Sequence, residues 1–125
     1  KIKKKFERSC LIELKKRKIK FICLAGFLKI LSKNFIADFK YKIVNVHPSL
    51  LPKFKGLNTF KKVLKSKEIY AGSTVHFVSE KLDSGEIILQ KKILMEKNET
   101  EASLKRKVLK EEHKLYSEAI RLIFK

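Results

Sequence analysis

The sequence predicts an α/β fold in a single domain that spans residues 1–125. Apolar runs of strand length alternate with segments whose apolar residues recur every three or four positions, as on one face of a helix. One short helical segment separates the first two apolar runs, which is typical of a right-handed parallel crossover. The chain has 125 residues and 44% of them are hydrophobic, enough for one packed core. We therefore expect a mostly parallel sheet flanked by helices.

The first half of the chain should form two helices and two strands. A helix is expected at about residues 4–17, where apolar side chains recur at helical spacing between charged ones. A buried strand at 19–25 should end in a turn at Gly26. Ser32 has the side chain of a helix cap, so a short helix should follow it before a second strand at 42–47.

The second half should begin with a turn-rich stretch at 48–57, which contains both prolines. The elements expected after it are a helix at about 59–65, a strand at 73–78, a polar loop at 79–85, a strand from 86 to about 92, and a helix from Glu101 to the C-terminus. Thr100 should cap the last helix.

The basic composition suggests a phosphate-bearing partner, but its pattern favours another interpretation. Lys and Arg number 31 against 13 Asp and Glu, which makes the formal net charge +18. Few of these cations are Arg, the residue that most often reads phosphates and base edges. The lysines are spread over every segment instead of forming one stripe. We interpret the charge as a solvated surface and expect no specific nucleic-acid partner.

The sequence shows no sign of a membrane span or a metal site. The longest apolar run, residues 21–28, is far shorter than the roughly 20 residues of a membrane helix. Cys10 and Cys23 lack metal-ligand spacing, so we expect buried free thiols, no metal and a cytoplasmic location. The chain begins with Lys1 rather than Met and has no cleavage signal, which predicts a fragment without its N-terminal part.

Polar residues at the end of the second expected strand are the first candidates for chemistry, because ligands of open parallel sheets bind where strands end. Asn45 and His47 are two positions apart and share one face, and Pro48 restricts the backbone of His47. An amide N–H and a protonated imidazole suit an oxyanion at a carbonyl carbon. A carboxylate would hold the imidazole charged, with Asp83 the first candidate and Glu80 the second. From spacing alone, such a pair is more often a hydrogen-bonded strand end than a catalytic site.

Three segments carry a more specific pattern. They are Leu24–Ser32 (LAGFLKILS), Asn45–Gly56 (NVHPSLLPKFKG) and Ser73–Gly85 (STVHFVSEKLDSG). In this order and spacing they resemble phosphoribosylglycinamide formyltransferase of purine synthesis. The resemblance extends over essentially all 125 residues and corresponds to about the last two-thirds of the family's usual length. It implies a Rossmann-like formyltransferase fold.

The resemblance also implies a reaction. In that family a formyl group passes from 10-formyltetrahydrofolate to the amine of glycinamide ribonucleotide, through an oxyanionic tetrahedral intermediate and without a metal. The family's catalytic Asn, His and Asp correspond to Asn45, His47 and Asp83. His47 would be the general acid that meets the oxyanion, Asn45 a neutral donor beside it, and Asp83 the group that keeps the imidazole charged.

Two binding segments follow from the same resemblance. The residues expected to bind the folate are Leu28, Lys29, Ile30, Leu31, Asn45, Ser79, Glu80, Lys81, Leu82 and Asp83. Those expected to bind the ribonucleotide are Leu109, Lys110, Glu111 and Glu112. Without the resemblance, Leu28 to Leu31 would be ordinary core packing and the second set an exposed helix face. His76 is expected to be a hydrogen-bonded structural histidine that faces the site.

The chain departs from the family at its N-terminus. The family's first strand and its glycine-rich phosphate-binding turn have no counterpart in the sequence. We therefore expect a domain without its phosphate-binding portion, poorly soluble or inactive by itself. The expected partners are the two small-molecule substrates, and the protein would be a monomer or a homodimer.

Three alternatives stay open. Formyltetrahydrofolate deformylase shares the Asn, His and Asp but gives the formyl group to water, and its proline loop usually departs from HPSLLP. Methionyl-tRNA formyltransferase shares the domain but typically carries Trp-Arg-Gly in that loop, and this chain has no Trp. A basic nucleic-acid-binding module would bind DNA or RNA with a steep salt dependence that survives His47→Ala.

Overall fold

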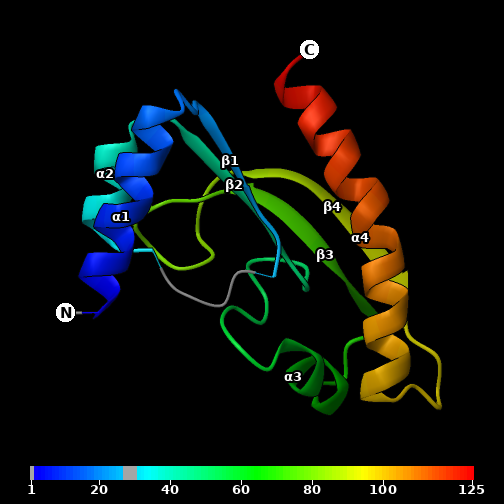
Figure 1. Ribbon diagram of the computed structural model, residues 1–125. Helices are drawn as coiled ribbons and strands as arrows, with labels where there is room; N and C mark the ends of the chain where they lie inside the picture. Colours follow the sequence, from blue (N-terminus) through cyan, green and yellow to red (C-terminus); the bar gives the residue numbers. More distant parts are fainter. Residues whose placement is uncertain (1, 27–30) are drawn as a thin grey trace.

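A four-stranded sheet forms the centre of the computed structural model, which describes residues 2–26 and 31–125 (Figure 1). The strands are β1 (Phe21–Leu24), β2 (Lys42–His47), β3 (Tyr70–Phe77) and β4 (Ile87–Leu94), and they lie side by side in this order. The helices are α1 (Ile2–Lys16), α2 (Lys33–Phe39), α3 (Thr59–Lys65) and α4 (Glu101–Ile123). The predicted alternation of helices and strands is confirmed.

The sheet is mixed, which corrects the prediction of a mostly parallel one. β1 pairs with β2 in parallel, whereas β3 is antiparallel to both β2 and β4. Residues 78–86, between β3 and β4, are fewer than the dozen or more that a parallel crossover needs. Between β2 and β3, helix α3 packs beside α4 near one end of the sheet instead of crossing a face (Figure 1).

The boundaries of the elements mostly agree with the sequence-based ranges. β2 and α3 begin and end as expected, whereas β3 begins at Tyr70 instead of Ser73. Gly72 interrupts the apolar pattern there, yet it lies inside the strand. A Cβ atom on Gly72 would lie 2.1 Å from the carbonyl oxygen of Lys91 in β4. The glycine is therefore a requirement of close strand pairing and not a strand boundary.

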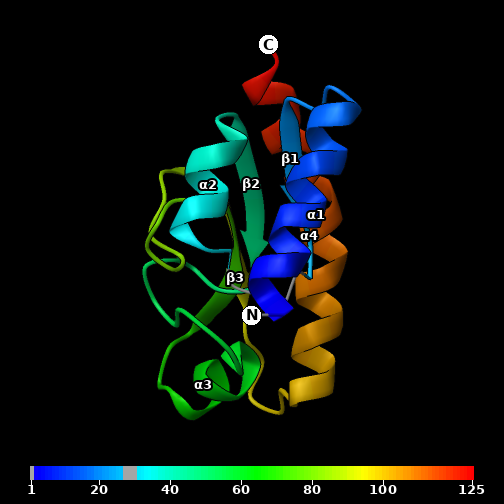
Figure 2. The same ribbon diagram turned by 60° about the vertical axis from the view of Figure 1, so that its left-hand side comes forward.

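Helices cover both faces of the sheet (Figure 2). The core beneath α1 and α2 is centred on Phe35, Phe39 and Ile43. The core beneath α4 contains Val46, Val75, Leu115 and Ala119. Because side chains alternate along β2, Asn45 and His47 lie on the same face as Ile43, toward the end of the strand. The two polar side chains are thus placed beyond the apolar core that α2 covers.

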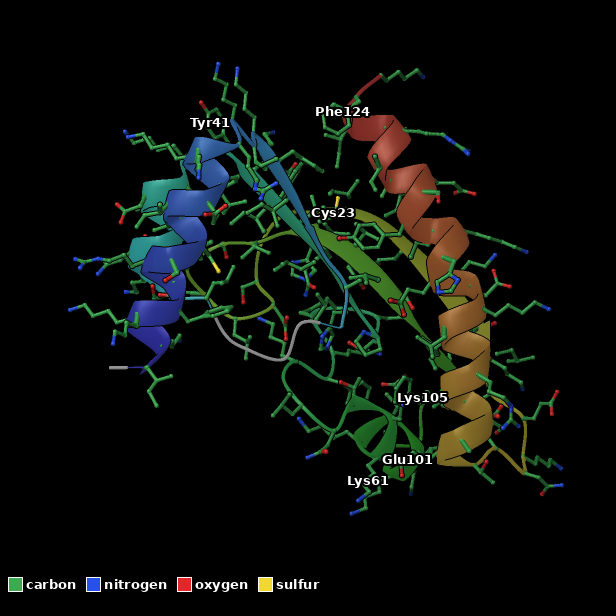
Figure 3. All side chains as sticks on the ribbon, viewed as in Figure 1. Cys23, Tyr41, Lys61, Glu101, Lys105 and Phe124 are labelled. Atoms are coloured by element: carbon green, nitrogen blue, oxygen red, sulfur yellow. The ribbon has the colours of Figure 1, made fainter. Side chains whose placement is uncertain are left out.

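The basic side chains are spread over the surface, as expected from the scattered lysines of the sequence. Nitrogen-tipped side chains project from all four helices (Figure 3). Both cysteines are free, as expected, but neither is fully buried. Cys10 on α1 is half-buried, and Cys23 is exposed because β1 lies at the edge of the described sheet. None of the helices formed by the described residues combines the length and the apolar character that a membrane span needs.

Candidate functional site

A cleft of about 420 Å³ lies where β1 and β2 end. Its walls are formed by the ends of these two strands, by residues 56–60 after the proline-containing loop, and by residues 78–83 after β3. Glu101, in the first turn of α4, lines it as well. The volume is typical of small-molecule sites, which range over about 300–1,000 Å³. The cleft therefore lies where ligands bind in open sheets.

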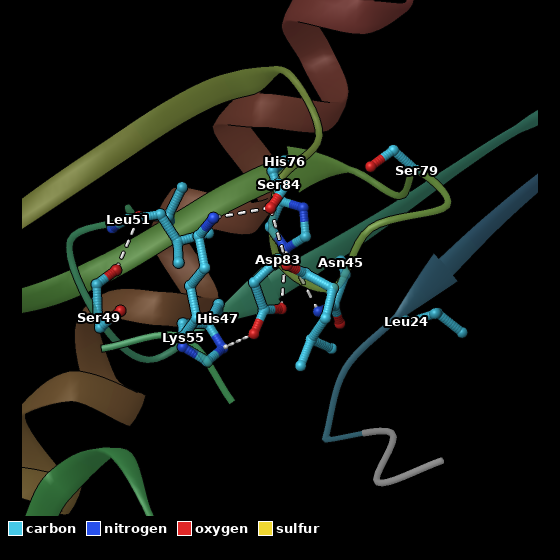
Figure 4. Close-up of polar contacts among 12 residues, drawn as sticks. Leu24, Asn45, His47, Ser49, Leu51, Lys55, His76, Ser79, Asp83 and Ser84 are labelled. Atoms are coloured by element: carbon cyan, nitrogen blue, oxygen red, sulfur yellow. Dashed lines mark hydrogen bonds and ion pairs between the residues drawn. The ribbon is translucent and has the colours of Figure 1, made fainter. Parts of the chain in front are cut away.

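Asn45, His47 and Asp83 come together in this cleft, as the sequence predicted (Figure 4). β2 supplies the first two residues, and the loop between β3 and β4 supplies the third. The Nδ1 atom of His47 lies 3.6 Å from Oδ2 of Asp83, and each side chain is only 7% exposed. Because both groups are largely withdrawn from water, their interaction is stronger than that of an exposed pair.

A backbone carbonyl settles which nitrogen of His47 faces the carboxylate. Nε2 lies 2.8 Å from the carbonyl oxygen of Phe54, so this nitrogen carries a proton and donates it. Nδ1 is then the nitrogen that faces Asp83, and it gains a proton when the ring becomes charged. Both ring nitrogens of His47 therefore face hydrogen-bond acceptors.

Two consecutive residues of the proline-containing loop hold Asp83 and its neighbour Ser84 in place. The backbone N–H of Gly56 donates to its Oδ2 at 2.8 Å, and Lys55 donates to the hydroxyl of the adjacent Ser84 at 2.7 Å. The loop returns to β3 at Gly85, where an added Cβ atom would lie 1.6 Å from the carbonyl oxygen of Phe77. Only glycine permits this close approach, so the loop geometry that presents the carboxylate depends on Gly85.

His76 lies beside these residues on β3. Its Nε2 atom lies 3.4 Å from Nδ2 of Asn45 and 3.9 Å from Oδ1 of Asp83. Its Nδ1 atom lies 3.1 Å from the carbonyl oxygen of Phe77. Burial lowers the pKa of His76, while the Phe77 carbonyl and the Asp83 charge oppose the effect. The His76 side chain faces the cleft, as expected from the sequence.

Part of the expected folate-binding set lines the cleft. Leu31 and all five residues of the 79–83 loop lie on its wall. Leu28, Lys29 and Ile30 fall outside the described residues. The 79–83 loop therefore closes one side of the same cavity that holds Asn45 and His47.

The expected ribonucleotide-binding residues are not among those that line the cleft. Leu109 is exposed on α4, and Glu112 is half-buried, with a pKa that burial raises. Glu112 precedes Tyr116 by one helical turn, and the Tyr116 hydroxyl donates to the carbonyl oxygen of Leu24 in β1 at 2.7 Å. This part of α4 thus lies along β1, and its role in binding stays a prediction.

Two contributors to the site carry no signal that sequence patterns could reveal. They are the carbonyl of Phe54 and the backbone N–H of Gly56, which contact His47 and Asp83. Every residue has these groups, so only the folded loop identifies them. Gly56 does have a φ of 87°, which accounts for a glycine at that position. Among the described residues, no group of three or more His, Cys, Asp or Glu side chains could hold a metal ion.

Comparison with known proteins identifies the family. A family model described as formyl transferase matches residues 1–120. The chain belongs to the formyl transferase family. The human trifunctional purine biosynthetic protein adenosine-3 is 40% identical over 118 residues, which are 94% of this chain and 12% of that protein. The chloroplastic phosphoribosylglycinamide formyltransferase of Arabidopsis thaliana is 40% identical over 112 residues, which are 86% of this chain and 38% of that protein.

Solved structures confirm the Rossmann-like formyltransferase fold. Phosphoribosylglycinamide formyltransferase from Anaplasma phagocytophilum superimposes with a TM-score of 0.89 at 39% identity, over 93% of this chain and 57% of that one. The enzyme from Brucella melitensis gives a TM-score of 0.89 at 40% identity, over 97% of this chain and 62% of that one. This formyl transferase chain thus spans only part of the length of the relatives it matches.

Proposed function

We propose that this formyl transferase chain carries the formyl-transfer site of a phosphoribosylglycinamide formyltransferase. The donor would be 10-formyltetrahydrofolate and the acceptor the amine of glycinamide ribonucleotide, in purine biosynthesis. The observation that carries the proposal is the meeting of Asn45, His47 and Asp83 on one cleft wall. Relatives with 40% identity bear the name of this enzyme or of a purine biosynthetic protein.

The cleft suits a folate. Leu24, Leu31 and Val78 give it apolar surface, and backbone and side-chain polar groups of the 79–83 loop stand at its edge. A flat heterocycle needs this combination of apolar walls with a few polar groups that fix its orientation. The bound folate would supply a formyl group on its N10 atom. We assign the folate to Leu31 and to the 79–83 loop, and extend the assignment to Leu28, Lys29 and Ile30 as expected from the sequence.

Asn45 and His47 would stabilise the negative charge that develops on the formyl oxygen when the amine adds to the formyl carbon. Asn45 contributes a neutral N–H. The imidazolium of His47, whose two N–H groups face Phe54 and Asp83 in this structure, contributes its positive charge beside the oxyanion. His47 is buried and Asn45 is half-buried, and hydrogen bonds are stronger where water is partly excluded than in solvent. His47 then has a proton available for the nitrogen that leaves.

Asp83 would keep His47 in the required state. Its carboxylate lies 3.6 Å from Nδ1 of His47 and compensates the positive charge of the ring. It also lies close enough to the cleft to accept the proton that the attacking amine releases. The N–H of Gly56 fixes the carboxylate oxygen that faces the histidine. The proton balance of an amine-to-amine transfer is thus handled by two side chains.

The other parts of the proposal follow from the same assignment. We place the ribonucleotide near Leu109, Lys110, Glu111 and Glu112 of α4, and the protein in the cytoplasm as a monomer or a homodimer. Neither a metal ion nor a specific nucleic acid is needed for the reaction. The scattered lysines would raise the local concentration of two anionic substrates.

A direct assay with two acceptors tests the proposal. The phosphate-binding N-terminal segment that the sequence predicts to be missing is first restored from the parent gene. The resulting protein is incubated with 10-formyltetrahydrofolate, first with glycinamide ribonucleotide and then without it, and both formylated product and free formate are measured. We expect product that depends on the ribonucleotide and is abolished by His47→Ala, with an unchanged circular dichroism spectrum. Formate release that does not need the ribonucleotide would instead identify a deformylase.

A further inference from the structure

His76 lies beside the proposed catalytic residues, but the proposed reaction gives it no role. Its side chain is 3% exposed, and both of its ring nitrogens have polar neighbours. Nδ1 lies 3.1 Å from the carbonyl oxygen of Phe77, which can only accept a hydrogen bond. Nδ1 therefore carries a proton. If the ring is neutral, Nε2 has a free lone pair and can only accept.

Burial lowers the pKa of His76, which favours the neutral ring. Two charged or titratable groups face it, Asp83 from the loop after β3 and His47 from β2. Asp83 favours a charged ring and His47 opposes one. Nε2 is 3.9 Å from the nearer Asp83 oxygen and only 3.4 Å from the Asn45 nitrogen. A neutral Nε2 matches the amide N–H of Asn45, whereas a protonated Nε2 would oppose it.

We propose that His76 is a positioning residue that orients the side-chain amide of Asn45 for catalysis. One N–H of the amide is donated to Nε2 of His76, which fixes Nδ2 and not Oδ1 as the atom on that side. The second N–H is then left for the formyl oxygen, because Asn45 lines the cleft. Within the described part of the chain the Asn45 amide has no other hydrogen bond. Without His76, nothing in that part would prevent the amide from turning its carbonyl toward the oxyanion.

The backbone around His76 supports this role. β2 and β3 pair so that Asn45 and His76 are direct partners in the register. The pairing of β3 with β4 shifts between Val75 and His76, so that His76 is opposite Ile87. Irregularities of this kind next to a site re-aim a side chain relative to a regular strand. The ring of His76 is thereby placed over Asn45 by two strands and not by a mobile loop.

A spectroscopic test needs no activity. The chain has three histidines and a mass of 14.6 kDa, so long-range ¹H–¹⁵N spectra can report the tautomer of each ring. The resonances of His76 are assigned from their loss in His76→Gln. We expect a neutral His76 with its proton on Nδ1 at pH 7. A proton on Nε2, or a charged ring, would overturn the inference even if the enzyme transfers formyl groups.

A kinetic test asks whether His76 acts through Asn45, and this test rests on the proposed function. We expect His76→Ala to lower kcat by about 10- to 100-fold, since misplacement of one catalytic donor by about 1 Å can have an effect of that size. The KM for the folate should change little. In an Asn45→Ala background, His76→Ala should have no further effect. Multiplicative losses in the double variant would contradict the inference.

A conservative variant separates positioning from stability. The side-chain oxygen of Gln can take the place of Nε2 as an acceptor, so His76→Gln should recover most of the kcat lost in His76→Ala. Thermal unfolding shows whether both variants fold. Equal losses in two folded variants would count against the inference. A wild-type protein that has its N-terminal segment restored and still transfers no formyl group would contradict the proposed function. The tautomer measurement would still decide the role of His76.

Discussion

A buried acid on the basic helix α1 gives a quantitative prediction. Glu7 is 7% exposed, and its two carboxylate oxygens accept hydrogen bonds from the N–H of Ser32 at 2.9 Å and from its hydroxyl at 2.6 Å. The same hydroxyl caps α2 by accepting from the N–H of Phe35 at 3.1 Å. In Glu7→Gln, the side-chain oxygen still accepts from one of the two Ser32 donors. The NH₂ group that replaces the second oxygen cannot accept from the other. One hydrogen bond to a charged acceptor is lost, which costs about 1.5–3 kcal/mol.

Urea unfolding followed by circular dichroism measures this loss. Glu13→Gln is the matched control, because Glu13 lies on the same helix but is half-exposed and pairs only with Arg17 at 3.2 Å. We expect the control to cost less than about 0.5 kcal/mol. Equal free energies of unfolding for Glu7→Gln and Glu13→Gln would refute the reasoning.

The difference in free energy of unfolding between the wild type and Glu7→Gln should also depend on pH. Desolvation raises the pKa of Glu7, but the two hydrogen bonds from Ser32 and the charge of Lys3 together lower it below its ordinary value in the folded protein. The stability contributed by Glu7 is therefore fully present above the unfolded pKa of about 4.3 and is lost as pH falls through the folded value. The gap between the wild type and Glu7→Gln should be constant from pH 5 to pH 7 and narrow below about pH 4.

Two further substitutions test the loop and the helix around the site. Gly85→Ala places a Cβ atom 1.6 Å from the carbonyl oxygen of Phe77, so the loop that carries Asp83 must move. We expect at least about a 10-fold loss of formyl transfer with α4 intact by circular dichroism, and an unchanged rate would contradict the loop geometry. Tyr116→Phe removes the hydroxyl that donates to Leu24 at 2.7 Å, and thermal unfolding should show a loss of about 1 kcal/mol. A melting temperature equal to that of the wild type would show that this contact contributes nothing.

The sequence predicted those elements whose pattern is local. The run from Lys42 to His47 contains three β-branched apolar residues and is followed by a proline, and β2 has these bounds. Thr100 caps α4 as expected. The direction of β3 and β4 depends on how connections run in space, which periodicity does not report, and the parallel prediction was wrong for that reason.

In the candidate site, too, local patterns were predicted from the sequence and long-range contacts were not. Spacing placed Asn45 and His47 on one face. The sequence offered Asp83 first and Glu80 second as the carboxylate beside them, and the family resemblance favoured Asp83. The structure brings Asn45, His47 and Asp83 together. The contact between Glu7 and Ser32 joins residues that are far apart in sequence, and a buried Glu among lysines looks like any surface charge until the helices pack. The amide orientation of Asn45 likewise depends on a partner in another strand. Long-range polar contacts are therefore what the sequence does not reveal.

The charge of Asp83 provides the most direct test of the proposed reaction. Asp83→Asn keeps the size of the side chain and removes the charge that faces His47, and Asp38→Asn removes the same charge from an exposed position on α2. Formyl transfer to glycinamide ribonucleotide is measured for both variants in the protein with its N-terminal segment restored. We predict a loss of about 100-fold or more for Asp83→Asn and a rate within about twofold of the wild type for Asp38→Asn. Equal rates for the two folded variants would contradict the assignment of this cleft as the site of formyl transfer.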